Sequence, residues 1–161
     1  MSELAVARPV DDLSARPISR DRRLIGRALE DWDRLRGRRA FPSCRDFDDS
    51  AVPDDKPHVF VVEIGAEEGE DRIIRAGRAV IAALGLNPVG RRATDVLPSA
   101  VDRGLSFCRT VATHRKPIAD AGKFTNVAGV EIQYRSIMLP SSSDQQRIDY
   151  VVGALSFRIL D

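Results

Sequence analysis

The sequence has 161 residues, of which 43% are hydrophobic and 30% are charged, and its formal net charge is +1. This length supports a single hydrophobic core, and this composition excludes an intrinsically disordered chain. The near-zero net charge argues against a uniformly basic nucleic-acid-binding protein.

The charges are nevertheless segregated along the chain. Residues 41–71 carry 2 basic and 10 acidic side chains, whereas residues 72–117 carry 9 basic and 2 acidic ones. Opposed blocks of this kind either pair within the fold or form complementary surfaces between chains.

The sequence shows no sign of a membrane span or of export. No apolar run approaches the roughly 20 residues that cross a bilayer, and the N-terminus lacks the apolar stretch of a signal peptide. The two cysteines, Cys44 and Cys108, do not form a disulfide framework pattern. We therefore expect a soluble, cytoplasmic protein.

The N-terminal third is predicted to hold one helix. Residues 1–19 have little periodicity and are interpreted as a flexible arm. From residue 20, apolar side chains recur at helical spacing until Gly37, which predicts an amphipathic helix. Its apolar stripe either covers the core of its own domain or packs against a second subunit. The candidate self-association residues are Leu24, Ala28, Trp32 and Leu35.

Residues 38–57 follow as a long connection, because three prolines interrupt any regular element. Their acidic run lacks the ligand spacing of a calcium-binding loop, which favours a solvated acidic loop. We therefore divide the chain into an arm at 1–19, a helix with its acidic loop at 20–57, and a core at 58–161.

The core is predicted to be α+β. Residues 58–64 and 72–77 form a hairpin, and residues 78–84 form a short helix. A longer helix runs from about 101 to 115, and further strands are expected at 118–124, 130–139 and 148–160. The strand at 130–139 alternates and is expected to have one wet face. This order predicts a five-stranded antiparallel sheet with helices on one face, preceded by the amphipathic helix.

The residues offer no constellation for catalysis or for a metal. The two histidines, His58 and His114, do not combine with Ser, Cys or Asp at catalytic or zinc-binding spacing. No glycine-rich loop follows a strand in phosphate-binding form. We expect a protein that is not an enzyme.

The order of elements resembles the PAS domain family, and more closely a bacterial subfamily of small, stand-alone PAS proteins. The resemblance covers about residues 20–160. It is carried by the order and spacing of short motifs, which are Trp32, Leu35-Arg36-Gly37, Pro42-Ser43, Asp46-Phe47-Asp48, Pro57-His58-Val59-Phe60, Arg75-Ala76-Gly77, Leu84-Gly85, Val89-Gly90-Arg91, Met138-Leu139-Pro140 and Val152-Gly153-Ala154-Leu155.

This resemblance implies five antiparallel strands that cradle helices around a small cavity. PAS domains bind small molecules, hold haem or flavin, or serve as dimerisation and docking modules. The candidate pocket residues here suit a ligand and equally suit a filled core; they are Phe107, Cys108, Val111, Tyr134, Ser136 and Leu155.

Two cofactors are weighed from the same resemblance. Light-sensing relatives hold a reactive cysteine in a segment that here reads Leu86-Asn87-Pro88-Val89-Gly90 and has no cysteine. Oxygen-sensing relatives bind haem iron through a histidine on the longer helix. His114 is therefore the candidate haem ligand, with an exposed or capping histidine as the alternative.

The sequence as a whole predicts a stand-alone sensory or adaptor module of bacterial signalling, which acts through protein–protein contact with an unidentified regulatory partner. We expect that no output domain follows the last strand. We expect a homodimer, no nucleic acid, no required cofactor, and an unknown small molecule in the core. The alternative is a ligand-free docking or dimerisation scaffold. A basic region at Arg91, Arg92, Arg103, Arg109 and Arg115 lacks a nucleic-acid-binding motif and suits an acidic protein surface.

Overall fold

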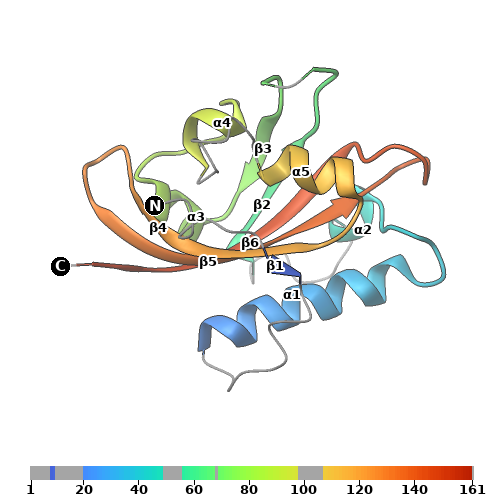
Figure 1. Ribbon diagram of the computed structural model, residues 1–161, viewed down its shortest axis with the longest axis horizontal. Helices are drawn as coiled ribbons and strands as arrows, with labels where there is room; N and C mark the ends of the chain where they lie inside the picture. The colour runs from blue at the N-terminus through green and yellow to red at the C-terminus, as the bar shows by residue number, and fades with distance from the viewer. Residues whose placement is uncertain (1–7, 10–19, 49–55, 68, 98–106, 161) are drawn as a thin grey trace.

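The computed structural model describes residues 8–9, 20–48, 56–67, 69–97 and 107–160. Its six strands are β1 Arg8–Pro9, β2 Val59–Glu63, β3 Arg72–Ala76, β4 Ile118–Thr125, β5 Glu131–Ser141 and β6 Tyr150–Ile159. Its helices are α1 Arg20–Arg36, α2 Cys44–Asp48, α3 Arg78–Leu84, α4 Ala93–Val96 and α5 Phe107–His114. The strands form one antiparallel sheet in the order β1-β4-β5-β6-β2-β3 (Figure 1).

The predicted five-stranded antiparallel sheet is confirmed in β2 to β6. The last three strands return beside the first hairpin, because β6 pairs with both β5 and β2. β1 adds a two-residue edge strand, in which Arg8 pairs with Ala119 and Pro9 with Ile118. The interpretation of residues 1–19 as a flexible arm stays a prediction; it did not include this short strand, since two residues are too few to show a periodicity. The other residues of 1–19 lie outside the described part.

Helices cover both faces of the sheet (Figure 1). We call the face toward α3, α4 and α5 the inner face, and the face toward α1 the outer face. The prediction of helices on one face holds for α3 to α5, whereas α1 packs against β5 and β6 from the other side. The apolar stripe of α1 therefore covers its own domain, with Ile25 and Trp32 buried.

The packing of α1 explains a departure from the sequence analysis. In the first half of β5, buried residues alternate with exposed or half-buried ones, whereas every residue from Ser136 to Ser141 is buried. The strand was expected to have one wet face throughout. The second half loses that wet face because α1 lies on it, and the Trp32 indole Nε1 donates a hydrogen bond to the Pro140 carbonyl oxygen at 2.8 Å.

Other expectations fall partly outside the described residues. The longer helix is seen as α5, and residues 98–106, which include its predicted start, lie outside the described part.

The connection at 38–57 contains the short helix α2. Burial raises the pKa of Asp46, but hydrogen bonds from the Ser43 amide and the Arg39 guanidinium outweigh burial and lower the pKa below its usual value. Every described helix is too short or too polar to cross a membrane.

The centre of the inner face depends on one glycine. Phe60 and Gly153 are paired on β2 and β6, and the Phe60 ring lies across the glycine. A Cβ atom built on Gly153 would lie 2.1 Å from the Phe60 Cζ atom. The absence of a side chain at Gly153 therefore lets the Phe60 ring pack against the sheet.

We expect Gly153→Ala to lower the free energy of unfolding by about 1–3 kcal/mol, because an overpacked core must shift a buried ring. The matched control is Gly26→Ala in α1, where an added Cβ meets no atom within 4 Å. Alanine favours a helix by about 1 kcal/mol over glycine, so the control should not destabilise. Urea unfolding of both variants tests this, and equal stabilities would contradict the described packing.

Candidate functional site

Three buried polar side chains lie on the inner face of β4 and β5. Asp120 and Ser136 are paired across the two strands, and Tyr134 lies two residues before Ser136 on the same face. The Tyr134 hydroxyl donates a hydrogen bond to the Asp120 Oδ2 atom. We call Asp120, Tyr134 and Ser136 the inner polar cluster.

The electrostatics of this cluster keep the phenol protonated. Burial raises the pKa of Tyr134 well above its usual range, and the charge of Asp120 and the hydrogen bond to it raise this pKa further. Tyr134 is therefore a fixed donor to the carboxylate at any physiological pH. Such a donor and acceptor pair in an apolar setting can orient one polar group of a small molecule.

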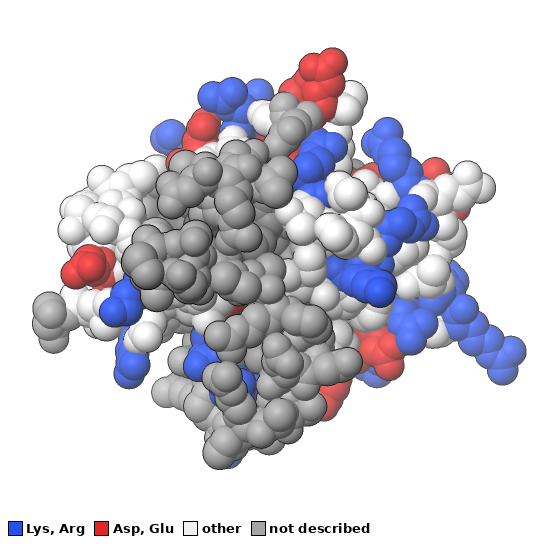
Figure 2. Space-filling view, in the orientation of Figure 1, with Lys and Arg blue, Asp and Glu red and all other residues white. Residues whose placement is uncertain are grey.

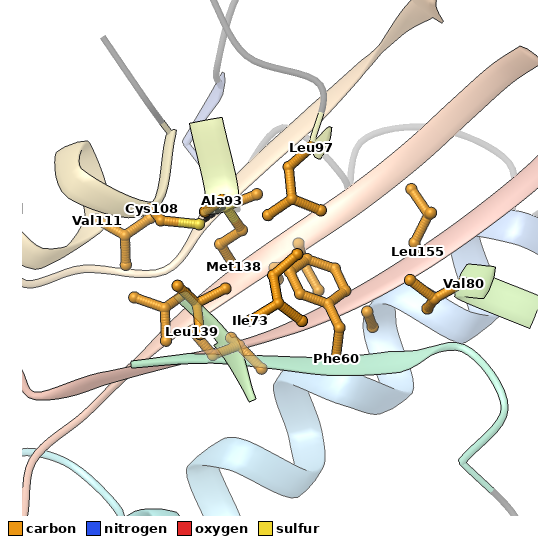
Figure 3. Packing of buried hydrophobic residues seen from close by; sticks show 14 of the residues in the cluster. Phe60, Ile73, Val80, Ala93, Leu97, Cys108, Val111, Met138, Leu139 and Leu155 are labelled. Atoms are coloured by element: carbon orange, nitrogen blue, oxygen red, sulfur yellow. Dashed lines mark hydrogen bonds between the residues drawn. The ribbon is translucent and has the colours of Figure 1, made fainter. Parts of the chain in front are cut away.

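Apolar side chains surround the inner polar cluster. The Phe124 ring meets the Tyr134 ring edge-on at 5.7 Å, and Leu155 is paired with Ser136. From α5, the Cys108 Sγ atom lies 3.7 Å from the Met138 Sδ atom (Figure 3). A thiol beside a thioether within van der Waals reach is typical of a packed core.

The predicted pocket residues are brought together by the fold. Cys108, Val111, Tyr134, Ser136 and Leu155 are all buried. The side chain of Phe107, the first residue of α5, lies outside the described part. Burial is what both a ligand pocket and a filled core require, so the assignment of these residues to a pocket stays a prediction.

Asp120 is not among the predicted pocket residues, although the sequence contains a signal for it. Ile118, Asp120, Gly122 and Phe124 are spaced by two and therefore share one face of β4, so an acidic residue stands in an otherwise apolar row. Its pairing with Ser136 depends on the register between β4 and β5, which the local pattern did not supply.

The described part of the inner face is densely packed. Phe60, Ile73, Val80 and Leu155 lie close together in its centre (Figure 3) and are almost completely buried. This packing favours the filled-core interpretation at the sheet centre. A ligand that reaches the inner polar cluster must displace some of these side chains.

The residues present do not fit the two cofactor chemistries weighed above. His114 is exposed at the end of α5, so its imidazole does not enter the inner face as a haem ligand would. Segment 86–90 has no cysteine, Cys108 contacts Met138 in the core, and Cys44 lies in α2. Neither cysteine is thus in the segment where light-sensing relatives hold theirs.

Three of the four candidate self-association residues, Leu24, Ala28 and Trp32, lie against the chain's own sheet. Trp32 is buried there, and Leu24, Ala28 and Leu35 are half-buried. The structure thus favours the first of the two interpretations of the apolar stripe. Among the described residues, no group of three or more His, Cys, Asp or Glu side chains is arranged to hold a metal ion.

Comparisons with known proteins give matches in structure alone. No protein-family model matches the sequence, and no curated protein matches it. The structure is similar to the LOV domain of the blue-light activated histidine kinase of Erythrobacter litoralis. The identity is 15%, the TM-score is 0.50, and the match covers 63% of this chain and 95% of that chain.

Two further solved structures are similar. One is a light-oxygen-voltage domain studied with a flavin analogue, at 9% identity and a TM-score of 0.52, with 67% of this chain and 82% of that chain covered. The other is an RNA-binding light-oxygen-voltage receptor, at 14% identity and a TM-score of 0.54, with 98% of this chain and 38% of that chain covered. At such low identities these matches concern the fold.

Proposed function

We propose that this chain, a domain of the PAS fold, is a sensory or adaptor module that acts by binding rather than by catalysis. The observation that carries the proposal is the inner polar cluster, three buried polar side chains in an apolar face. They lie on β4 and on β5, and β5 is one of the two strands against which α1 packs from the other side. The fold and the presence of that cluster support a module that receives a small molecule and passes the change to a partner protein in the bacterial cytoplasm.

The ligand class follows from the chemistry of the cluster. A small, mainly apolar molecule with one hydrogen-bond donor would pair with the Asp120 carboxylate while its apolar part replaces core contacts. Because the core is packed, binding selects a minor state in which side chains such as Leu155 have moved. The ligand then shifts the population by its preference for that state.

The output follows from the two faces of β5 and β6. These strands carry Tyr134, Ser136 and Leu155 on the inner face, and Leu139 and Val152 face α1 on the outer side. A change in the twist of β5 and β6 would therefore alter the packing on the inner face and the packing of α1 on the outer face. We propose that the position of α1 on the sheet is the signal read by a partner or by a second copy in a homodimer.

The surface offers a complementary region for an acidic partner. Lysine and arginine side chains gather on the right-hand part of the face in Figure 2, at the end where α1 and α5 terminate and the β5–β6 loop lies. The exposed basic residues at this end are Arg38, Arg39, Arg115, Lys116 and Arg147.

One similar structure belongs to an RNA-binding receptor, so the expectation that this chain binds no nucleic acid stays a prediction.

The decisive experiment is native mass spectrometry of the chain purified from its own host. We expect a stoichiometric small molecule on the wild type, and its loss in Tyr134→Phe, because the phenol no longer fixes the Asp120 carboxylate. The control is Arg135→Gln, one residue along β5 and on the outer face, which should keep the ligand. A bare protein mass under native conditions would contradict the sensor proposal.

The second candidate function is a ligand-free docking or dimerisation scaffold. The packing of Phe60 across Gly153 favours it, because that ring fills the centre of the inner face. The affinity for the partner protein distinguishes the two functions. A scaffold binds its partner equally well as wild type and as Tyr134→Phe. For a sensor, partner binding by the wild type depends on the small molecule, and Tyr134→Phe loses this dependence.

A further inference from the structure

A pocket opens on the outer face, on the opposite side of the sheet from the inner polar cluster. It lies between α1, α2 and the strands β2, β5 and β6, and its volume is about 110 Å³. Its apolar lining consists of Leu24 and Ala28 of α1, Phe47 of α2, Val59 of β2, Leu139 of β5, and Val152 and Ala154 of β6. This pocket is separate from the inner polar cluster and has no role in the function proposed above.

Among the described residues, the charged side chains that line this pocket leave an excess of positive charge. Arg27, Asp31 and Lys56 also line it. The Asp31 carboxylate is already paired with Arg34 at 3.0 Å. Within the described part of the chain neither Arg27 nor Lys56 forms an ion pair, and the Lys56 Nζ atom lies 5.7 Å from the centre of the Phe47 ring.

The helix places these groups on one side of the pocket. Leu24, Ala28 and Asp31 are spaced by four and three residues, so they share the face of α1 toward the sheet, and Arg27 stands beside them at its edge. The guanidinium of an arginine matches a carboxylate with two parallel hydrogen bonds. An anionic group at the mouth would therefore meet Arg27 and Lys56 while the rest of the molecule enters an apolar space.

The volume limits the size of the molecule. An engineered apolar cavity of about 150 Å³ takes up benzene, so a pocket of about 110 Å³ that is open at its charged mouth suits one ring or a short branched chain. We propose that this pocket binds a small apolar carboxylate of about the size of benzoate. Its ring would rest on Val152 and Ala154, and its carboxylate would pair with Arg27 and Lys56.

Such a ligand would act on α1 directly. It would contact the helix and the sheet at the same time, so its binding would stabilise the docked position of α1. This second input does not depend on a ligand at the inner polar cluster, and it stands or falls separately from the sensor proposal.

The test is a ¹⁵N–¹H NMR titration of the full chain with benzoate, alongside benzamide as a neutral molecule of the same shape. We expect saturable shifts at the amides of Ala28, Val59 and Val152 to Ala154, and an affinity for benzoate at least about tenfold above that for benzamide. A hydrogen bond to a charged group corresponds to roughly that factor.

Two variants and one control locate the site. Arg27→Gln should weaken benzoate binding about tenfold, and Ala28→Leu should abolish it by filling the space. The matched control is Arg23→Gln, an exposed arginine one turn earlier in α1 that does not line the pocket. Equal affinities for benzoate and benzamide, shifts confined to the inner face, or equal binding by Arg27→Gln and Arg23→Gln would each overturn the proposal.

Discussion

Arg109→Met is expected to lower the free energy of unfolding by about 3–5 kcal/mol, the usual cost of breaking a buried ion pair by removing one partner. The Arg109 Nη2 atom lies 2.5 Å from the Asp71 Oδ1 atom. The Asp71 side chain is 1% exposed and that of Arg109 is 21% exposed. The variant would leave the carboxylate buried beside an apolar side chain.

The ion pair also fixes the β2–β3 hairpin to α5. The same Arg109 Nη2 atom lies 2.8 Å from the Glu67 carbonyl oxygen and 3.2 Å from the Gly65 carbonyl oxygen. Asp71 in turn accepts a hydrogen bond from the Gly65 amide at 2.9 Å. Loss of the guanidinium therefore frees the turn between the strands as well as the carboxylate.

A double-mutant cycle separates the pair from its surroundings. Asp71 Oδ2 and Arg109 Nε are buried and have no hydrogen-bond partner among the described residues, so within this part of the chain the pair does not recover its full desolvation cost. The double variant Arg109→Met with Asp71→Leu should therefore be more stable than Arg109→Met alone. Urea unfolding provides the four stabilities.

The control for this cycle is an exposed pair of similar geometry. The Arg92 Nε atom lies 3.1 Å from the Asp95 Oδ2 atom, and both side chains are about half exposed. Arg92→Met should change the stability by less than about 1 kcal/mol, as surface pairs do. Equal losses in Arg92→Met and Arg109→Met would show that burial does not set the strength of the Asp71 pair.

This ion pair shows that the segregated charges pair at least partly within the fold rather than only between chains. Asp71 ends the acidic block at 41–71 and Arg109 belongs to the basic block at 72–117, so the two blocks meet inside one chain. The remaining basic residues at the end of α5 stay on the surface, where they are available to a partner.

The parts of the fold that depend on local pattern were predictable from the sequence. The alternation in the first half of β5 and the helical spacing of Cys108 and Val111 are each visible within one element, and they correctly predicted that Ile132, Tyr134, Cys108 and Val111 are buried. The contact between Trp32 and Pro140 joins residues that are 108 positions apart. No local pattern encodes it, and the burial of the second half of β5 followed from it.

The candidate sites show the same division. Tyr134 and Ser136 were predicted from a strand pattern, whereas Asp120 entered the inner polar cluster only through the register between two strands. The pocket beneath α1 combines residues from two helices and three strands. Arg27 and Lys56 match no motif in the sequence. They become candidate ligand-binding residues only because the fold places both of them at the same pocket.

Trp32→Ala is expected to lower the free energy of unfolding by about 3–5 kcal/mol, because it leaves a large cavity between α1 and the sheet. Trp32→Phe should cost less, about 1–3 kcal/mol, since it keeps most of the packing but leaves the buried Pro140 carbonyl oxygen without its donor. The difference between the two variants measures the packing of the ring apart from its hydrogen bond.

The same variants decide between the two interpretations of the apolar stripe. If α1 covers its own sheet, Trp32→Ala loosens the helix, raises hydrogen exchange along α1 and exposes Leu139, Val152 and Ala154, which promotes association in light scattering. If the stripe joins two subunits, Trp32→Ala instead yields smaller particles with an unchanged free energy of unfolding. The control is Arg34→Ala, which removes an exposed ion pair on the same helix. It should change the free energy of unfolding by less than about 0.5 kcal/mol and leave the particle size in light scattering at the wild-type value.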